Sequence, residues 1–173
     1  MPTGFVVNAH RRDPYKTFKF RVIWEGRTVL GVNKVGALKR TTNVVNYREG
    51  GDNSYERKSP GRTTYDAITL ERGITHDTEF EAWASKVHAY GGDALMDLVG
   101  YRRDIEIAVM NERGHVAMRY FVYGAWPSEF QALPGLDAGE DATAIETLKL
   151  EIEGFARDVD TKEPDEAGAV PAG

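Results

Sequence analysis

The sequence predicts a mainly β protein, a small antiparallel β-barrel of two packed sheets with one α-helix beside it. Two observations favour this fold class. Apolar and polar residues alternate along most of the chain, which places them on opposite faces of a strand. One stretch changes to the period of an amphipathic helix. A single helix among about six or seven strands is best placed over the open side of a curled sheet.

The N-terminal half is expected to contain four strands. Residues 18–24 alternate apolar and polar side chains and predict the first strand. A turn at 26–27 precedes a second strand, which starts near Thr28. A longer β-prone stretch runs over 38–47, and apolar residues alternate again within 65–72.

The C-terminal half is expected to add a hairpin and a last strand. Residues 105–109 predict one strand of the hairpin, 111–114 the turn and 116–125 the returning strand. Residues 147–153 alternate again and predict the last strand. Ile145 is out of phase with that row, which indicates either a bulge or a strand covered on both faces.

Residues 77–89 predict the helix. Their apolar positions follow the i, i+3, i+4, i+7 spacing of one helix face. These positions are Phe80, Trp83, Ala84 and Val87. Asp77 or Thr78 can cap the first turn, and Thr78 and Glu81 have the spacing of a capping box.

Length and charge divide the chain into one domain with two flanking segments. With 173 residues, one compact domain with one core is expected, since a domain of this size buries roughly 70 % of its unfolded surface. We predict an N-terminal arm over 1–12, a β-barrel domain over 13–156 and an acidic tail over 157–173. The tail has no aromatic residue, so on its own it is expected to be flexible; ordering against a neighbouring subunit is the alternative.

The composition excludes several classes of protein. No cysteine is present, which excludes a disulfide scaffold, a thiolate metal site and a cysteine nucleophile. The four histidines lack ligand spacing, since even the closest pair, His76 and His88, is twelve positions apart. The serines lack the base and orienting group of a nucleophile. We therefore expect no catalytic residue, no metal and no cofactor. No apolar run is long enough to span a bilayer and no signal peptide is recognisable, which predicts a cytoplasmic product.

The stretch 46–64 fits no core strand and is expected to form an extended hairpin that reaches away from the body. Glu49, Asp52 and Glu56 offer oxygen ligands, yet the calcium-loop pattern is absent. Basic residues interleave with tyrosines, as on barrels that bind single-stranded nucleic acid, although the pI of 5.4 is not basic. These residues are Tyr55, Arg57, Lys58, Arg62 and Tyr65. A β-barrel module that binds single-stranded nucleic acid or peptide is thus the alternative function.

The expected strands have polar faces of mixed charge, as at Thr69 and Glu71 or Lys149 and Glu151. In an isolated barrel such a face is the hydrated outside. In a ring of joined sheets it forms the wall of a water-filled channel, and no strand edge stays bare. The residues alone leave both interpretations open.

Five motifs in order carry a resemblance to a known family. They are DPYKTFKFRV from Asp13, NYREGGDNSYERKSPG from Asn46, ITLERGIT from Ile68, AWP at Ala125 and AIETLKLEIEG from Ala144. On the basis of these motifs, residues 13–156 closely resemble the tail-tube family. This family includes the tail-tube protein of contractile-tailed phages and the inner-tube protein of phage-tail-like contractile injection systems. The related ring of type VI secretion shares its fold.

The resemblance implies a structural subunit without catalysis. Family members form hexameric rings that stack into a hollow tube, and a contractile sheath drives the tube through a target envelope. The implied partners are further copies of the chain, the sheath protein, the baseplate and cap proteins and, in the lumen, effector cargo or DNA. The implied location is a phage tail or phage-tail-like particle assembled in the cytoplasm, without insertion of the chain into a membrane.

The family's long loop falls on 46–64, which implies contacts with neighbouring subunits there. We expect inter-subunit salt bridges in this stretch, with Tyr55 as an aromatic anchor. The candidate residues are Arg48, Glu49, Asp52, Asn53, Tyr55, Arg57 and Lys58. Residues 90–100 and the tail from 157 depart from the family's pattern. For the first stretch, contact with the sheath or a neighbour is a hypothesis; for the tail, a role as an outer or inter-ring arm.

Overall fold

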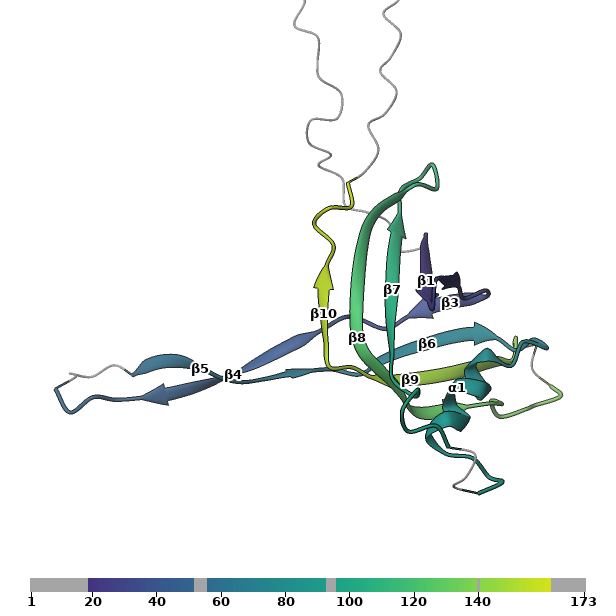
Figure 1. The fold of residues 1–173 in the computed structure, drawn as a ribbon, viewed down its shortest axis with the longest axis horizontal. Coiled ribbons are helices and arrows are strands. Elements are labelled where there is room, and N and C mark those ends of the chain that lie inside the picture. The colour runs from purple at the N-terminus through teal and green to yellow at the C-terminus, as the bar shows by residue number, and fades with distance from the viewer. Residues whose placement is uncertain (1–18, 52–55, 93–95, 140, 163–173) are drawn as a thin grey trace, which may run out of the picture.

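The structure is a computed structural model and describes residues 19–51, 56–92, 96–139 and 141–162. Within them the protein is mainly β, with one helix (Figure 1). In chain order the elements are β1 (Phe20–Trp24), β2 (Arg27–Thr28), β3 (Val32–Val35), β4 (Arg40–Tyr47), β5 (Arg57–Tyr65), β6 (Ile68–Gly73), α1 (Glu79–Val87), β7 (Arg103–Met110), β8 (Val116–Gln131), β9 (Ile145–Glu151) and β10 (Gly154–Arg157).

Strand β8 belongs to two sheets. Its N-terminal part pairs with β7 and β10, and from Trp126 onward it pairs with β9. We call β2, β1, β7, β10 and the N-terminal part of β8 the first sheet, and β3, β6, β9 and the C-terminal part of β8 the second sheet. Figure 1 shows β8 curving from one sheet into the other. All pairings are antiparallel, so the predicted fold class of two packed antiparallel sheets is confirmed.

The change of direction in β8 depends on Gly124. This residue has a φ of +61°, a conformation that favours glycine. A Cβ at this position would also lie 2.7 Å from Oε2 of Glu153. The sequence predicts that the returning strand of the hairpin ends at 125, whereas β8 continues to Gln131. Proline within a strand usually indicates an edge, and Pro127 lies in the part of β8 that is not predicted.

The apolar rows of the strands form one core between the two sheets. The alternation predicted for β1, β7 and β9 is confirmed, because their predicted apolar rows face this core. The fully buried side chains include Val22, Ile68, Leu70, Phe80, Trp83, Ile105, Val122, Leu148 and Leu150. Such burial contributes about 1.5–3 kcal/mol for each large aliphatic side chain. The folded body therefore has a core of its own.

Helix α1 closes this core, as predicted for residues 77–89. The ring centroids of Phe80 and Trp83 lie 5.9 and 4.9 Å from that of Trp24 on β1. Nε1 of Trp83 also donates a hydrogen bond to the carbonyl of Tyr101, at 2.6 Å. The predicted capping box is wrong, because Thr78 makes no side-chain cap bond. Instead Oδ1 of Asp77 accepts the N–H of Glu79 at 2.9 Å.

A buried cation lies where α1 meets the second sheet. Arg72 is 1 % exposed, pairs with Glu146 of β9 and lies 3.1 Å from Oδ2 of Asp77. Its guanidinium carbon lies 4.2 Å from the ring centroid of Phe80. Glu146 thus occupies the core row of β9, which is why Ile145 is out of phase. The register between β6 and β9 continues to Ile145 without a shift, so no bulge in this strand pair explains the position of Ile145.

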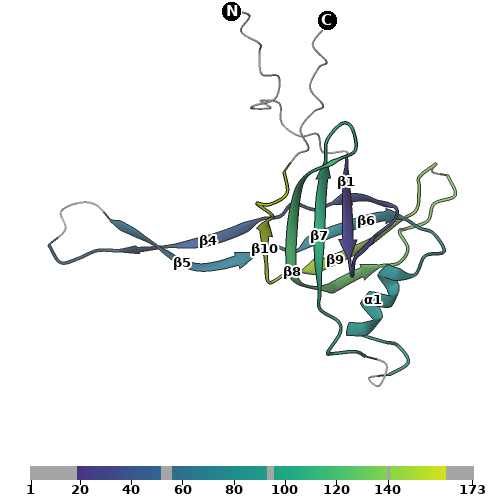
Figure 2. The same cartoon turned by 45° about the horizontal axis from the view of Figure 1, so that its top comes forward.

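Strands β4 and β5 form a long hairpin that leaves the body, as predicted for the stretch 46–64 (Figures 1 and 2). We call β4, β5 and the described residues between them the arm. The arm continues the hairpin of β3 and β6 at the edge of the second sheet. Its strands begin earlier and end later than the predicted stretch, because they also include 40–45 and Tyr65.

Candidate functional site

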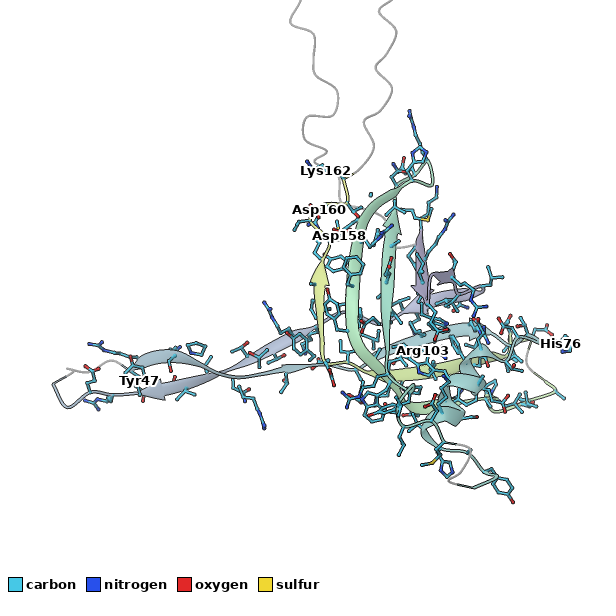
Figure 3. The ribbon with its side chains drawn as sticks, viewed as in Figure 1. Tyr47, His76, Arg103, Asp158, Asp160 and Lys162 are labelled. Atoms are coloured by element: carbon cyan, nitrogen blue, oxygen red, sulfur yellow. The ribbon has the colours of Figure 1, made fainter. Side chains whose placement is uncertain are left out.

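The arm is the candidate interaction site. Within the described residues, β4 and β5 pair only with each other. All residues of β4 are exposed, and so are most of β5. Three large apolar side chains lie on it, Val44 at 62 %, Val45 at 49 % and Tyr47 at 43 % exposure. Figure 3 shows Tyr47 far out on the arm. The outer edges of this ribbon therefore present backbone groups to solvent, and its faces present apolar side chains.

The cross-strand pairs of the arm are specific. Val44 lies opposite Pro60, and Tyr47 lies opposite Arg57. The register shifts between Thr42 and Val44, where a bulge re-aims the strand. Near this point Gly61 leaves room for the side chain of Val45, since a Cβ at position 61 would lie 2.9 Å from Cγ2 of Val45. The two strands of the arm thus pair in one defined register.

The arm is basic, although the whole chain carries a net charge of −5. Its described part has five cations and two carboxylates. They are Arg40, Arg48, Arg57, Lys58 and Arg62, against Glu49 and Glu56. The arm therefore complements an acidic surface.

The predicted site residues fall into two groups. Arg48 and Glu49 follow β4, and Arg57 and Lys58 begin β5, so the fold brings these four together at the outer end of the arm. Nη2 of Arg57 lies 3.8 Å from Oε2 of Glu49. Asp52, Asn53 and Tyr55 lie outside the described residues. Salt bridges from this end of the arm to another subunit remain a prediction.

The base of the arm contains further residues of the site, which are not predicted from the sequence. Tyr65 packs edge-on against Phe155 of β10, with ring centroids 5.6 Å apart. Nζ of Lys39 lies 3.1 Å from Oδ2 of Asp66, and the backbone joins the same two residues. Opposite charges at the two ends of a hairpin are the sequence signal that could have identified this pair. These contacts fix the direction of the arm relative to the body.

The alternative of a single-strand nucleic-acid site gains little from the geometry. Such a site needs several exposed aromatic rings on which successive bases stack. On the described part of the arm, Tyr47 at 43 % exposure is the one ring that qualifies. Tyr65 is partly buried and serves to anchor the arm on Phe155. Tyr55 lies outside the described residues.

Elsewhere the described residues offer little chemistry. They contain no group of three or more acidic or histidine side chains that could hold a metal ion. The backbone N–H of Gly100 lowers the pKa of Asp97, and the hydroxyl of Thr161 lowers the pKa of Asp158. Asp97 is exposed and Asp158 is partly buried, and both carboxylates close local turns. No helix in the described part of the chain is long and apolar enough to cross a membrane.

Comparisons with known proteins agree with this architecture. The model of the family described as T4-like virus tail tube protein gp19 matches residues 16–156. A chain of the PVC sheath-tube complex of an extracellular contractile injection system, in the extended state, is 23 % identical. The similarity covers 85 % of this chain and 93 % of that chain, with a TM-score of 0.70.

Two further solved structures share the fold. A chain of the anti-feeding prophage tube terminating cap is 22 % identical over 88 % of this chain and 98 % of that chain, with a TM-score of 0.68. A type six secretion system protein is 11 % identical over 87 % of this chain and 92 % of that chain, with a TM-score of 0.50. The fold predicted to resemble tail tubes and the type VI ring is confirmed. No curated protein matches the chain.

Proposed function

The chain belongs to the T4-like virus tail tube protein gp19 family, and from this membership we propose that it forms the inner tube of a contractile injection system. In this proposal six copies form a ring, and rings stack around a hollow channel. Sheath contraction drives the tube through a target envelope. The chain acts as a structural subunit, as tail tube proteins do, and not as an enzyme.

The arm is the observation that carries this proposal. An isolated two-stranded hairpin is marginally stable in water, and bare strand edges are sites where further chains pair. The arm nevertheless has a defined register and keeps Val44, Val45 and Tyr47 exposed. A neighbouring subunit that covers these edges supplies the missing burial. Because the arm and the surface that receives it differ, the contact is heterologous, and such contacts close into rings or extend into filaments.

The partners follow from the same proposal. Besides its own copies, the tube is expected to contact the sheath protein, baseplate proteins and cap proteins, with effector cargo or DNA in the lumen. The similar chains come from a sheath-tube complex and from a tube terminating cap, which supports the sheath and cap proteins as partners. We propose that the tube domain spans 13–156, with the N-terminal segment 1–12 before it and the acidic tail 157–173 after it. Assembly is expected in the cytoplasm.

The charged end of the arm is proposed to select the neighbour. A single exposed ion pair is worth only about 0–1 kcal/mol. The same contact is repeated by every subunit of a ring, so small terms accumulate over the assembly. Arg57 and Lys58 supply two adjacent cations at this end.

Electron microscopy of the purified full chain tests the proposal. We expect rings or tubes with a central channel. The double variant Arg57→Glu, Lys58→Glu is expected to fold but not to polymerise. A matched control, Arg27→Glu with Arg113→Glu, makes the same change in net charge at exposed positions outside the arm and the tail and is expected to polymerise. Featureless monomers of the unmodified chain would contradict the proposed function, and normal tubes from the first variant would contradict the role of its two cations.

A further inference from the structure

The two sheets present outer faces of different chemistry. On the second sheet Thr69 pairs with Lys149 and Glu71 with Thr147. Their neighbours in sequence, such as Leu70 and Leu148, face the core, so these side chains point outward. The outer face as a whole carries Lys34, Thr69, Glu71, Glu129, Gln131, Thr147, Lys149 and Glu151. It is a largely polar surface, with Trp126, the register partner of Glu151, and Ile145, the partner of Gly73, at its two ends.

The charges on this polar face largely balance. Nζ of Lys34 lies 2.7 Å from Oε1 of Glu71, and both side chains remain in contact with solvent. Lys149 lies opposite Glu129 in register. With Glu151, the face has two lysines and three carboxylates, and therefore a small negative excess. A hydrated surface of this kind attracts neither polyanions nor polycations strongly.

The first sheet presents a different outer face. Ile23 and Phe121 lie on it, and Tyr123 is 44 % exposed. These residues line a recess of about 310 Å³ that also includes Glu25 and Glu106. Exposed aromatic side chains are enriched where proteins contact proteins. In a channel they would hold passing chains, so this face is the less suitable wall.

The edges of the second sheet point to the same assignment. Within the described residues, β3 pairs only with β6, and the C-terminal part of β8 pairs only with β9. The sheet therefore ends in an open edge on both sides. The arm continues the β3–β6 hairpin at one of these edges, and Gly36, whose N–H donates to the carbonyl of Thr69 at 2.7 Å, lies at the junction. In the proposed ring, an arm that engages a neighbouring copy directs this edge of the second sheet toward that copy.

We propose that the outer face of the second sheet lines the channel and that the outer face of the first sheet points away from it. The inference rests on the proposed function and deepens it by naming the residues that meet the cargo. The wall then favours passage of a hydrated cargo over its retention, because charges of both signs alternate along it and no large apolar side chain interrupts its central rows.

Single thiols test the assignment, because the chain contains no cysteine. Thr147→Cys places a thiol on the proposed wall, and Tyr123→Cys places a matched thiol on the first sheet. Assembled tubes and unassembled subunits are treated with N-ethylmaleimide and with a maleimide on a gold particle too wide to enter the channel. Thr69→Cys provides a second position on the wall if Thr147→Cys impairs folding.

In unassembled subunits both thiols are expected to react with both reagents. In tubes the thiol at position 147 is expected to react with N-ethylmaleimide and to lose gold labelling except at the open ends, while the thiol at position 123 keeps its gold labelling along the tube. Gold along the tube at position 147, loss of both reactions there, or equal gold labelling at the two positions overturns the assignment. Failure of the unmodified chain to form tubes contradicts the proposed function instead.

Discussion

The body and the arm are built from the same kind of strand, yet their side chains meet different surroundings. Ile68 and Leu70 of β6 are 0 % exposed, whereas Val44 and Val45 of β4 are 62 % and 49 % exposed. The two strands belong to neighbouring segments of one long hairpin. The body therefore obtains its burial from its own chain, and the arm has to obtain it from another. The difference separates what folds the subunit from what assembles it.

Of the changes predicted, removal of the arm is expected to have the largest effect on assembly. It is expected to leave the folding of the body nearly unchanged. Arg40 and Tyr65 are a cross-strand pair, so a two-residue Asn-Gly turn can replace residues 41–64. We expect the shortened chain to stay monomeric, because it has lost the strand edges and the apolar side chains that the arm exposes, and to unfold at nearly the same temperature. Electron microscopy and thermal unfolding measure the two properties. Tubes from the shortened chain would break the division between body and arm.

A matched pair of aromatic substitutions sharpens the division. Trp83→Ala removes a fully buried ring and is expected to lower the free energy of unfolding by about 3–5 kcal/mol. Tyr47→Ala removes a ring that is 43 % exposed and is expected to change it by less than about 0.5 kcal/mol. Tyr47→Ala is expected to weaken assembly instead. Denaturant unfolding of the subunits and turbidity of the assembling protein provide the readouts.

The buried ion pair gives an effect of similar or slightly smaller size within the body. Arg72→Met leaves Glu146 without its cation and is expected to cost about 3–5 kcal/mol. Arg72→Met combined with Glu146→Leu leaves no buried charge, so most of this loss should be recovered. Denaturant unfolding of both variants measures the difference. A double variant as unstable as the single one would show that the pair contributes more than mutual neutralisation.

The smallest expected effect concerns the turn after α1. The N–H of Gly100 holds the pKa of Asp97 below its ordinary value of 3.8. A lowered pKa in the folded state means that this carboxylate stabilises the fold above its ordinary pKa and that the contribution disappears as the pH falls through the lowered value. Asp97→Asn should therefore flatten the loss of stability below about pH 4 slightly. Unfolding curves at several acidic pH values measure this slope.

Much of the body could be predicted from the sequence, because apolar periodicity reflects which face of a strand is buried. Two features of the body could not be predicted from this periodicity, each for a physical reason. The second half of β8 follows Gly124 and contains Pro127, residues that normally end a strand, and only the change of sheet explains them. Glu146 occupies a core row because Arg72 neutralises it from a distant strand, which periodicity does not reveal.

The site could be predicted less fully than the fold. Its location on a protruding hairpin followed from turn residues and charges that no core accommodates. The individual contacts could not be predicted, because the sequence pattern of one segment does not show which surface of another copy it contacts. Glu49 and Arg57 illustrate this limit, since in the subunit they lie 3.8 Å apart, whereas the sequence offered both as partners for another chain.

Hydrogen exchange of the arm tests the central claim most directly, namely that another subunit covers it. Backbone amides of β4 and β5 are measured in unassembled subunits and in assembled tubes, with β6 and β9 as the internal reference. We predict fast exchange of the outer arm in subunits, strong protection in tubes and slow exchange of the reference strands in both. Arm amides that exchange equally fast in tubes and in subunits would contradict the account.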